Sequence, residues 1–277
     1  MKGIQPEFNL EIIGELVKSG ATLKDLGKQY NVAPSSIGRA FRKLGITYNL
    51  QVRKIEKINN IFNIIDSELK AYLLGFFAAD GCVYDKSRFG LCIAEQDRYI
   101  INLFKNSIAP NSFIKETQNN KGAKNRQKQL FLRISSEEIV SDLKKYGLEE
   151  RKTYKPYIIP DIEDSLKWHF IRGYFDGDGH LGIRDHKTYK SCRISFSNGS
   201  KEILESIQKF TGKGKLKSCK TYWRLDIENL LDCKEFLDKM FNNCNYMLPR
   251  KYNKFLLVNA EVFAKSKKIV NSVTHRD

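Results

Sequence analysis

Two apolar runs of helical length dominate the hydrophobic pattern of the chain, and they are copies of each other. The segment DSELKAYLLGFFAADG (66–81) aligns without a gap with DSLKWHFIRGYFDGDG (164–179). Each copy starts with an Asp-Ser pair suited to N-capping a helix and stops at a glycine suited to a left-handed C-cap. The pattern therefore predicts two equivalent helices.

Alternating apolar and polar positions after each of these runs predict strands. In SCRISFSN (191–198), Ile194 and Phe196 fall on one face and polar side chains on the other. The segments LFLRIS (130–135) and TYWRLD (221–226) also match each other, which extends the repeat downstream. Each half is predicted to contain the motif helix, two strands, a helix, two strands and a helix. The expected fold class is α+β, with two pseudo-symmetric αββαββα half-domains.

A separate helical pattern precedes the repeats. Residues 9–46 include ATLKDLGKQYNVAPSSIGRAFRKLGI, in which Thr22 with Asp25 approximates a capping box and Pro34 suits the start of a second helix. This pattern resembles a helix-turn-helix, with a purely structural helical cap as the alternative. The second helix would present to a major groove the side chains of Ser35, Ser36, Arg39, Arg42 and Lys43. Its small core would consist of Leu23, Leu26, Val32, Ile37, Phe41 and Leu44.

These patterns divide the chain into five segments. We expect a helix-turn-helix-like domain at 1–46, a basic linker at 47–65, half-domains at 66–160 and 161–265, and a basic tail at 266–277.

Charge points to the class of partner. The chain holds 48 Lys and Arg against 32 Asp and Glu, a formal net charge of +16, which favours a polyanion over ordinary basic solubility. Its six cysteines form no CxxC pair, so free thiols are expected rather than a zinc site. The chain has no apolar stretch of membrane-spanning length and no signal-peptide core, so we expect an intracellular protein with no membrane partner.

Small residues on both motif helices predict that the helices pack together. Gly75 and Ala79 lie four residues apart in the first copy, as do Gly173 and Gly177 in the second. Glycine is unfavourable inside a helix, and close approach of two backbones gives a reason for it.

Such packing would bring together two carboxylates, Asp80 and Asp178, one at the end of each helix. A helix C-terminus repels anions, so acids placed there need another explanation. A divalent cation bound by hard oxygen ligands supplies one.

The motifs LLGFFAADG and IRGYFDGDG resemble the two motifs of a monomeric LAGLIDADG homing endonuclease, over roughly residues 60–265. The resemblance implies a saddle-shaped DNA-binding surface and double-strand cleavage across the minor groove, with short 3′ overhangs at a long asymmetric site. It implies Mg²⁺ as cofactor, Ca²⁺ supporting binding without cleavage and Mn²⁺ as a substitute. Double-stranded DNA is the implied partner, for a monomer.

The resemblance also assigns candidate roles to residues. The metal-binding acids are Asp80 and Asp178, with a metal site that extends over their neighbours Ala79, Gly81, Gly177 and Gly179. The polar residue that ends the second strand of each half corresponds to Glu95 or Gln96 and to Asn198. Basic catalytic candidates are Lys152 and Lys251, with Arg133 and Arg224 as alternatives. One departure is that the sixth motif position holds Asp176 in the second copy and Ala78 in the first, where it resembles a helix-end cap more than a metal ligand.

Basic and polar side chains on the predicted strands, loops and linker are the expected DNA contacts. Besides those of the N-terminal helix they are Arg53, Lys86, Arg88, Lys124, Arg126, Lys128, Arg133, Arg184, His186, Lys190, Arg193, Ser195, Ser197, Lys215, Lys217 and Arg224. Two other functions remain open on the same fold: an intron RNA maturase, and a non-catalytic DNA-binding regulator. Retention of both acids argues against them.

Overall fold

A computed structural model describes residues 23–43, 58–118, 128–186 and 190–260. The chain divides into two compact units, 1–57 and 58–277. Most of the expected linker, the expected C-terminal tail and Thr22 lie outside the described residues, as do the candidate DNA contacts Arg53, Lys124 and Arg126.

The N-terminal unit contains two short helices joined by a turn. Helix α2 spans Leu23–Gln29 and helix α3 spans Pro34–Lys43, with Asn31 in the left-handed region at a φ of 51°. Leu26, Ile37 and Phe41 are buried between them. The five polar residues predicted to face DNA on α3 are all exposed, and the helix-turn-helix assignment stays a prediction.

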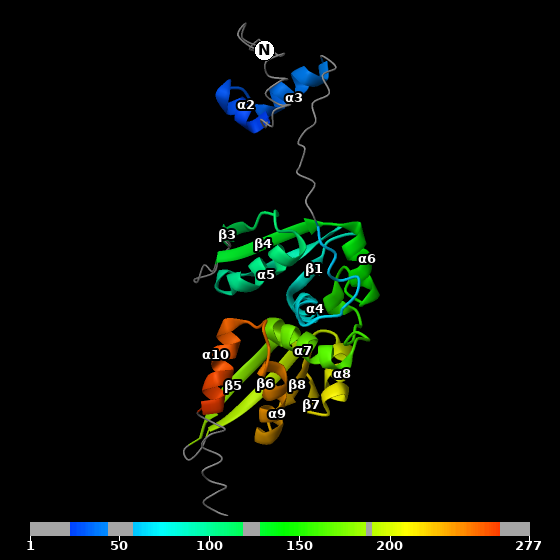
Figure 1. Cartoon of the computed structure of the whole chain (residues 1–277), viewed down its shortest axis with the longest axis vertical. Coiled ribbons are helices and arrows are strands. Elements are labelled where there is room, and N and C mark those ends of the chain that lie inside the picture. The colour runs from blue at the N-terminus through cyan, green and yellow to red at the C-terminus, as the bar shows by residue number, and fades with distance from the viewer. Residues whose placement is uncertain (1–22, 44–57, 119–127, 187–189, 261–277) are drawn as a thin grey trace, which may run out of the picture. The chain divides into compact units, whose positions relative to one another are not determined.

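The second unit contains the two predicted halves (Figure 1). The first half consists of α4 (Glu68–Asp80), β1 (Gly81–Val83), β2 (Arg88–Ala94), η1 (Glu95–Asp97), α5 (Arg98–Ile108), β3 (Lys115–Gln118), β4 (Lys128–Ser135), α6 (Glu137–Lys145) and η2 (Lys152–Tyr154). The second consists of α7 (Asp164–Asp178), β5 (Gly179–Asp185), β6 (Lys190–Asn198), α8 (Lys201–Thr211), β7 (Lys215–Ser218), β8 (Trp223–Ile227), α9 (Leu230–Phe241) and α10 (Pro249–Val258). The predicted α+β class is confirmed.

Each half folds around one antiparallel four-stranded sheet. The strand orders are β1-β2-β4-β3 and β5-β6-β8-β7, so the two sheets share one topology. Alternation along the strands separates the faces as the pattern predicted: Ile194 and Phe196 are fully buried, while Arg133 of β4 is exposed. Burying one face against helices leaves a polar face on each sheet.

The motif helices α4 and α7 pack directly on each other. A Cβ built at Gly75 would lie 2.0 Å from the carbonyl oxygen of Phe170, and one at Gly173 would lie 2.0 Å from that of Tyr72. No side chain fits at either position, because each backbone occupies the space beside the other helix's glycine. The predicted helix pairing is therefore confirmed.

Gly81 and Gly179 are the C-cap residues of the motif helices, as predicted, but the left-handed conformation predicted for them was wrong. Gly81 has a φ of −72° and Gly179 a φ of −81°, and both are extended rather than left-handed. Each helix leads straight into a strand, so the chain has no left-handed residue there. A Cβ at Gly81 would lie 2.3 Å from the Phe77 ring, and one at Gly179 would lie 2.1 Å from the Phe175 ring, so space explains these glycines.

The N-terminal capping expectation also needs correction. Ser67 is the N-cap of α4 but makes no capping hydrogen bond with its side chain. Helix α7 begins earlier, with Glu163 as N-cap, so Asp164 and Ser165 lie inside its first turn. Ser165 donates to Glu163 instead.

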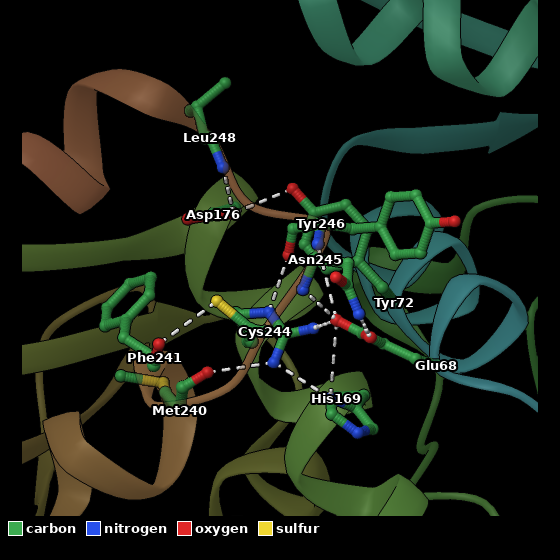
Figure 2. Close-up of polar contacts among 11 residues, drawn as sticks. Glu68, Tyr72, His169, Asp176, Met240, Phe241, Cys244, Asn245, Tyr246 and Leu248 are labelled. Atoms are coloured by element: carbon green, nitrogen blue, oxygen red, sulfur yellow. Dashed lines mark hydrogen bonds and ion pairs between the residues drawn. The ribbon is translucent and has the colours of Figure 1, made fainter.

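A buried polar network joins α4 and α7 to the loop between α9 and α10 (Figure 2). The guanidinium of Arg172, 1% exposed, donates from Nη2 to Glu68 Oε1 at 2.6 Å and from Nε to the carbonyl of Tyr246 at 2.7 Å. Glu68 also accepts from the backbone amide of Asn245 at 2.7 Å. The first half therefore contacts the loop between α9 and α10 through one carboxylate that is paired with one buried cation.

Candidate metal and DNA-cleavage site

The last turns of α4 and α7 bring the two motif carboxylates to one place. A Cβ at Gly177 would lie 2.4 Å from Ala79 Cβ and 3.2 Å from Asp80 Oδ2. Only a hydrogen side chain lets the second helix end approach the first acid so closely. The small residues of the two motifs therefore set the position of Asp80 relative to Asp178.

The surroundings of the two acids disfavour negative charge. Partial desolvation, and then the charge of Asp178, raise the pKa of Asp80 to about 6, although its side chain remains open to solvent. Burial also raises the pKa of Asp178, against the opposing effect of Lys152 and of a hydrogen bond from Asn198. A bound cation would reverse this preference, because it stabilises the charged form of both groups.

A buried lysine occupies the C-terminal end of each motif helix. Lys152 Nζ donates to the carbonyl of Ala79 at 2.8 Å, and Lys251 Nζ donates to the carbonyls of Phe175 and, at 2.7 Å, Gly179. Both side chains are over 90% buried, and burial lowers the pKa of Lys251 to about 8. Each lysine thus donates to carbonyls at the end of a motif helix and adds positive charge beside the acids.

Asn198 ends β6 beside the second acid. Its Nδ2 donates to Asp178 Oδ2 at 3.4 Å and to the hydroxyl of Tyr174 at 2.8 Å, while Oδ1 accepts from the amide of Ser200 at 2.8 Å. The Ser200 contact fixes which end of the amide faces the acid, since a backbone amide can only donate. Asn198 therefore orients Asp178.

The first half lacks this arrangement. Gly81 pairs with Leu91 and Gly179 with Phe196, so the strand position that corresponds to Asn198 holds the buried Ile93. The candidates two and three residues further on lie elsewhere: Glu95 contacts Arg98 at 3.2 Å and Lys128 at 3.8 Å, and Gln96 is exposed.

Sequence reasoning missed Asp97, whose charge contributes to the raised pKa of Asp80. Arg250 of α10 donates to both of its oxygens, at 2.8 and 3.0 Å. This pair connects η1 of the first half with the helix that carries Lys251. In the sequence, a hint of this pair was that Arg250 directly precedes the catalytic candidate Lys251.

Asp176, the departure between the motifs, lies inside the protein. It is 1% exposed, and its Oδ2 accepts from the Tyr72 hydroxyl at 2.8 Å and from the amide of Leu248 at 2.6 Å (Figure 2). Leu248 is the N-cap residue of α10. Asp176 thus anchors the start of the helix that delivers Arg250 and Lys251.

In the second unit, the predicted DNA contacts that the structure describes lie on the strands of the two sheets or in the turns between them. In the second sheet, a shallow concave surface of about 410 Å³ is lined by Arg184, Arg193, Ser195, Ser197, Arg224 and Tyr222, among others. Lys215 is exposed, and the His186 ring contacts Ser191 Oγ at 2.9 Å. Lys190 begins β6.

The first sheet holds its basic residues differently. The Arg133 guanidinium lies 4.5 Å from the centre of the Tyr84 ring, and Arg88 pairs with Asp85. Lys86 is exposed in the turn between β1 and β2, and Lys128 begins β4.

The donor set fits a hard divalent cation. No group of three or more His, Cys, Asp or Glu side chains capable of holding a metal occurs in the described part of the chain, so the two carboxylates would need backbone oxygen or water as further ligands. All six cysteines are free thiols. Within the described residues, no helix is long and apolar enough to cross a membrane.

Comparisons with known proteins agree with this architecture. The model of the LAGLIDADG-like domain matches residues 67–147 and again 165–240, over half of the chain. No curated protein matches the sequence significantly.

Solved structures share the fold at low sequence identity. The homing endonuclease I-GzeII in complex with its DNA target has a TM-score of 0.51 at 15% identity, covering 75% of this chain and 92% of that one. The meganuclease I-AabMI bound to uncleaved DNA has a TM-score of 0.51 at 14% identity, covering 73% and 92%. I-LtrWI bound to target DNA has a TM-score of 0.50 at 13% identity, covering 69% and 89%. Two family domains in one polypeptide, joined through their motif helices, place this chain in the LAGLIDADG family.

Proposed function

We propose that this protein is a homing endonuclease that acts as a monomer, binds a long asymmetric DNA site and cuts both strands with Mg²⁺. The observation that carries the proposal is the meeting of Asp80 and Asp178 at paired helix ends, each beside a buried lysine. Retention of both acids supports cleavage over a regulatory role or RNA binding as a maturase. The DNA-bound relatives support double-stranded DNA as the partner.

The chain's own groups divide the work between binding and positioning. Asp80 and Asp178 would hold the metal, and Asn198 keeps the second carboxylate oriented. A bound Mg²⁺ would supply an activated water and stabilise the leaving oxygen. Lys152 and Lys251 place fixed positive charge where negative charge develops, which favours the transition state over the ground state.

The remaining parts serve recognition. The polar sheet faces contact the duplex, and the exposed side of α3 reads a major groove. Phosphate contacts make binding dependent on salt. Mn²⁺ replaces Mg²⁺, and Ca²⁺ supports binding without cleavage.

The test uses supercoiled plasmid carrying a site recovered by selection from a random duplex library. With Mg²⁺ the wild type should produce linear DNA, and with EDTA it should not. Asp80→Asn and Asp178→Asn should each lose at least two orders of magnitude in linearisation, because each removes an anionic ligand while keeping the side chain's shape. Any residual activity should be nicking, since each acid serves one strand.

The matched control is Asp164→Asn, the same change at the exposed opposite end of α7. It should linearise the plasmid like the wild type. Linear product from Asp178→Asn at the wild-type rate would contradict the metal assignment. Selective binding without metal-dependent cleavage by the wild type would favour the regulator, and selection of RNA instead would favour the maturase.

A further inference from the structure

The polar face of the second sheet contains a buried acid among its basic residues. Asp226 of β8 has a side chain with no exposed surface. Four neighbours from three strands contact it: Arg193 and Ser195 of β6, Lys217 of β7 and Arg224 of β8. A carboxylate facing the proposed DNA surface opposes phosphate binding, so its presence calls for another reason.

The contacts to Asp226 use both carboxylate oxygens. Oδ1 accepts from Ser195 Oγ at 2.9 Å and from Arg193 Nε at 3.2 Å. Oδ2 accepts from Arg224 Nε at 3.1 Å and lies 2.9 Å from Lys217 Nζ. Burial alone would raise the pKa of Asp226, but these hydrogen bonds, with that from Arg193 foremost, hold it well below its ordinary value. The acid is therefore ionised when the protein binds DNA.

The two arginines that contact Asp226 differ in exposure and in the nitrogens they use. Arg193 is largely covered, and its Nη2 lies 2.5 Å from Asp226 Oδ2 in an ion pair. Arg224 is 31% exposed and donates from Nε to Asp226, and among the described residues its two terminal nitrogens donate no hydrogen bond. Arg224 is thus held in place at its Nε, and its two terminal nitrogens remain available at the concave surface that the residue lines.

The described residues of the first sheet include no buried acid. Because Gly81 pairs with Leu91 as Gly179 pairs with Phe196, Gly90 corresponds to Ser195. Gly90 pairs with Arg133 and Ser195 pairs with Asp226, so the first sheet has Arg133 where the second has Asp226, and Phe131 where the second has Arg224. Arg133 rests on the Tyr84 ring.

We propose that Asp226 is a specificity-determining positioning residue, which holds Arg224 so that its terminal nitrogens read a guanine in the half-site covered by the second sheet. An arginine fork bonded to guanine O6 and N7 is the commonest specific contact in the major groove. Asp226 also neutralises part of the local charge, which weakens binding to DNA of other sequence. The inference rests on the proposed function, because it assumes that this face contacts the duplex.

The test is selection of random duplex DNA in EDTA by the full chain and by Asp226→Asn. The wild type should enrich a guanine near one end of its site, and the variant should lose about tenfold in preference at that base pair. Affinity for random DNA should rise, with a steeper salt dependence by about one phosphate contact, because the released cations are free to bind phosphates. A merely structural defect would instead weaken binding to every sequence.

Matched variants make the result decisive. Asp85→Asn removes an acid that pairs with an arginine at the edge of the first sheet, and it should leave guanine preference unchanged. Arg224→Lys keeps the charge and loses the fork, so it should lose the same preference with an unchanged salt dependence even if Asp226→Asn melts early.

Two outcomes overturn the proposal in different ways. A guanine preference that survives both Asp226→Asn and Arg224→Lys would refute the inference and leave the endonuclease intact. A wild type that enriches no DNA sequence would refute the proposed function and the inference with it.

Discussion

The two motif carboxylates occupy the least favourable end of a helix, and the structure supplies partial compensation for each. Lys152 and Lys251 donate hydrogen bonds to backbone carbonyls at these ends. Their positive charges offset part of the negative helix dipole that the two carboxylates face. The compensation is incomplete, because the pKa of Asp80 still rises to about 6. A preformed cation site is expected to lower the stability of the fold when the metal is absent, because its carboxylates are then left uncompensated.

This cost predicts a pH dependence of stability in metal-free buffer. The pKa of Asp80 in the fold, about 6, exceeds the ordinary 3.8, so its contribution is most favourable at low pH and is lost as pH rises toward the folded pKa. Asp80→Asn should therefore match the wild type near pH 4 and become the more stable protein between pH 4 and 7. Denaturant unfolding at several pH values measures the difference.

Asp66→Asn is the control, at the other end of the α4 region. Its carboxylate pairs with Lys70, which lowers its pKa, so this variant should be slightly less stable than the wild type at pH 7 and equal to it at low pH. If both variants changed stability at pH 7 in the same direction, the account of Asp80 would be contradicted.

At the scale of elements, glycines allow α4 and α7 to pack closely in two different ways. At Gly75 and Gly173 the obstacle to a methyl group is the backbone of the other helix. At Gly177 it is the methyl group of Ala79. The first kind of contact cannot be relieved by a substitution, whereas the second can.

This difference predicts the outcome of a double-mutant cycle. Gly177→Ala should destabilise the fold by about 2 kcal/mol through overpacking, and adding Ala79→Gly should recover most of that loss, because the methyl group moves from one helix to the other. Gly75→Ala should cost about 3 kcal/mol and gain nothing from Ala79→Gly. Thermal and denaturant melts give the coupling energy, and full additivity of Gly177→Ala with Ala79→Gly would exclude the contact.

At the scale of the whole molecule, ion pairs between the two halves hold the second unit together. Glu68 of the first half pairs with Arg172 of the second, and Asp97 pairs with Arg250. Breaking a buried pair leaves an uncompensated charge inside the protein. The first 57 residues form a unit with contacts of its own.

Removing residues 1–57 should therefore leave the second unit folded and able to cut DNA with Mg²⁺. The footprint on the cognate site should shorten and the affinity should fall, because the exposed polar side of α3 is lost. Footprinting and plasmid linearisation measure the two effects separately. An unchanged footprint would remove the recognition role of α3, and loss of metal-dependent cutting at saturating protein would place catalytic groups outside the repeats.

The amino-acid sequence by itself determined the repeated α+β halves, the pairing of the motif helices and the two helix-end acids. These features depend on local periodicity and on residue types whose physical requirements are strict, such as glycine where backbones touch. Only the tertiary structure decided that Gly81 and Gly179 are extended, that Asp176 anchors α10, and that the first half has Ile93 where the second has Asn198. It also decided that Asp97 and Asp226 belong to the proposed functional surfaces. Strand register and long-range side-chain pairing set these contacts, because the partners are brought together by folding and not by their spacing in the chain.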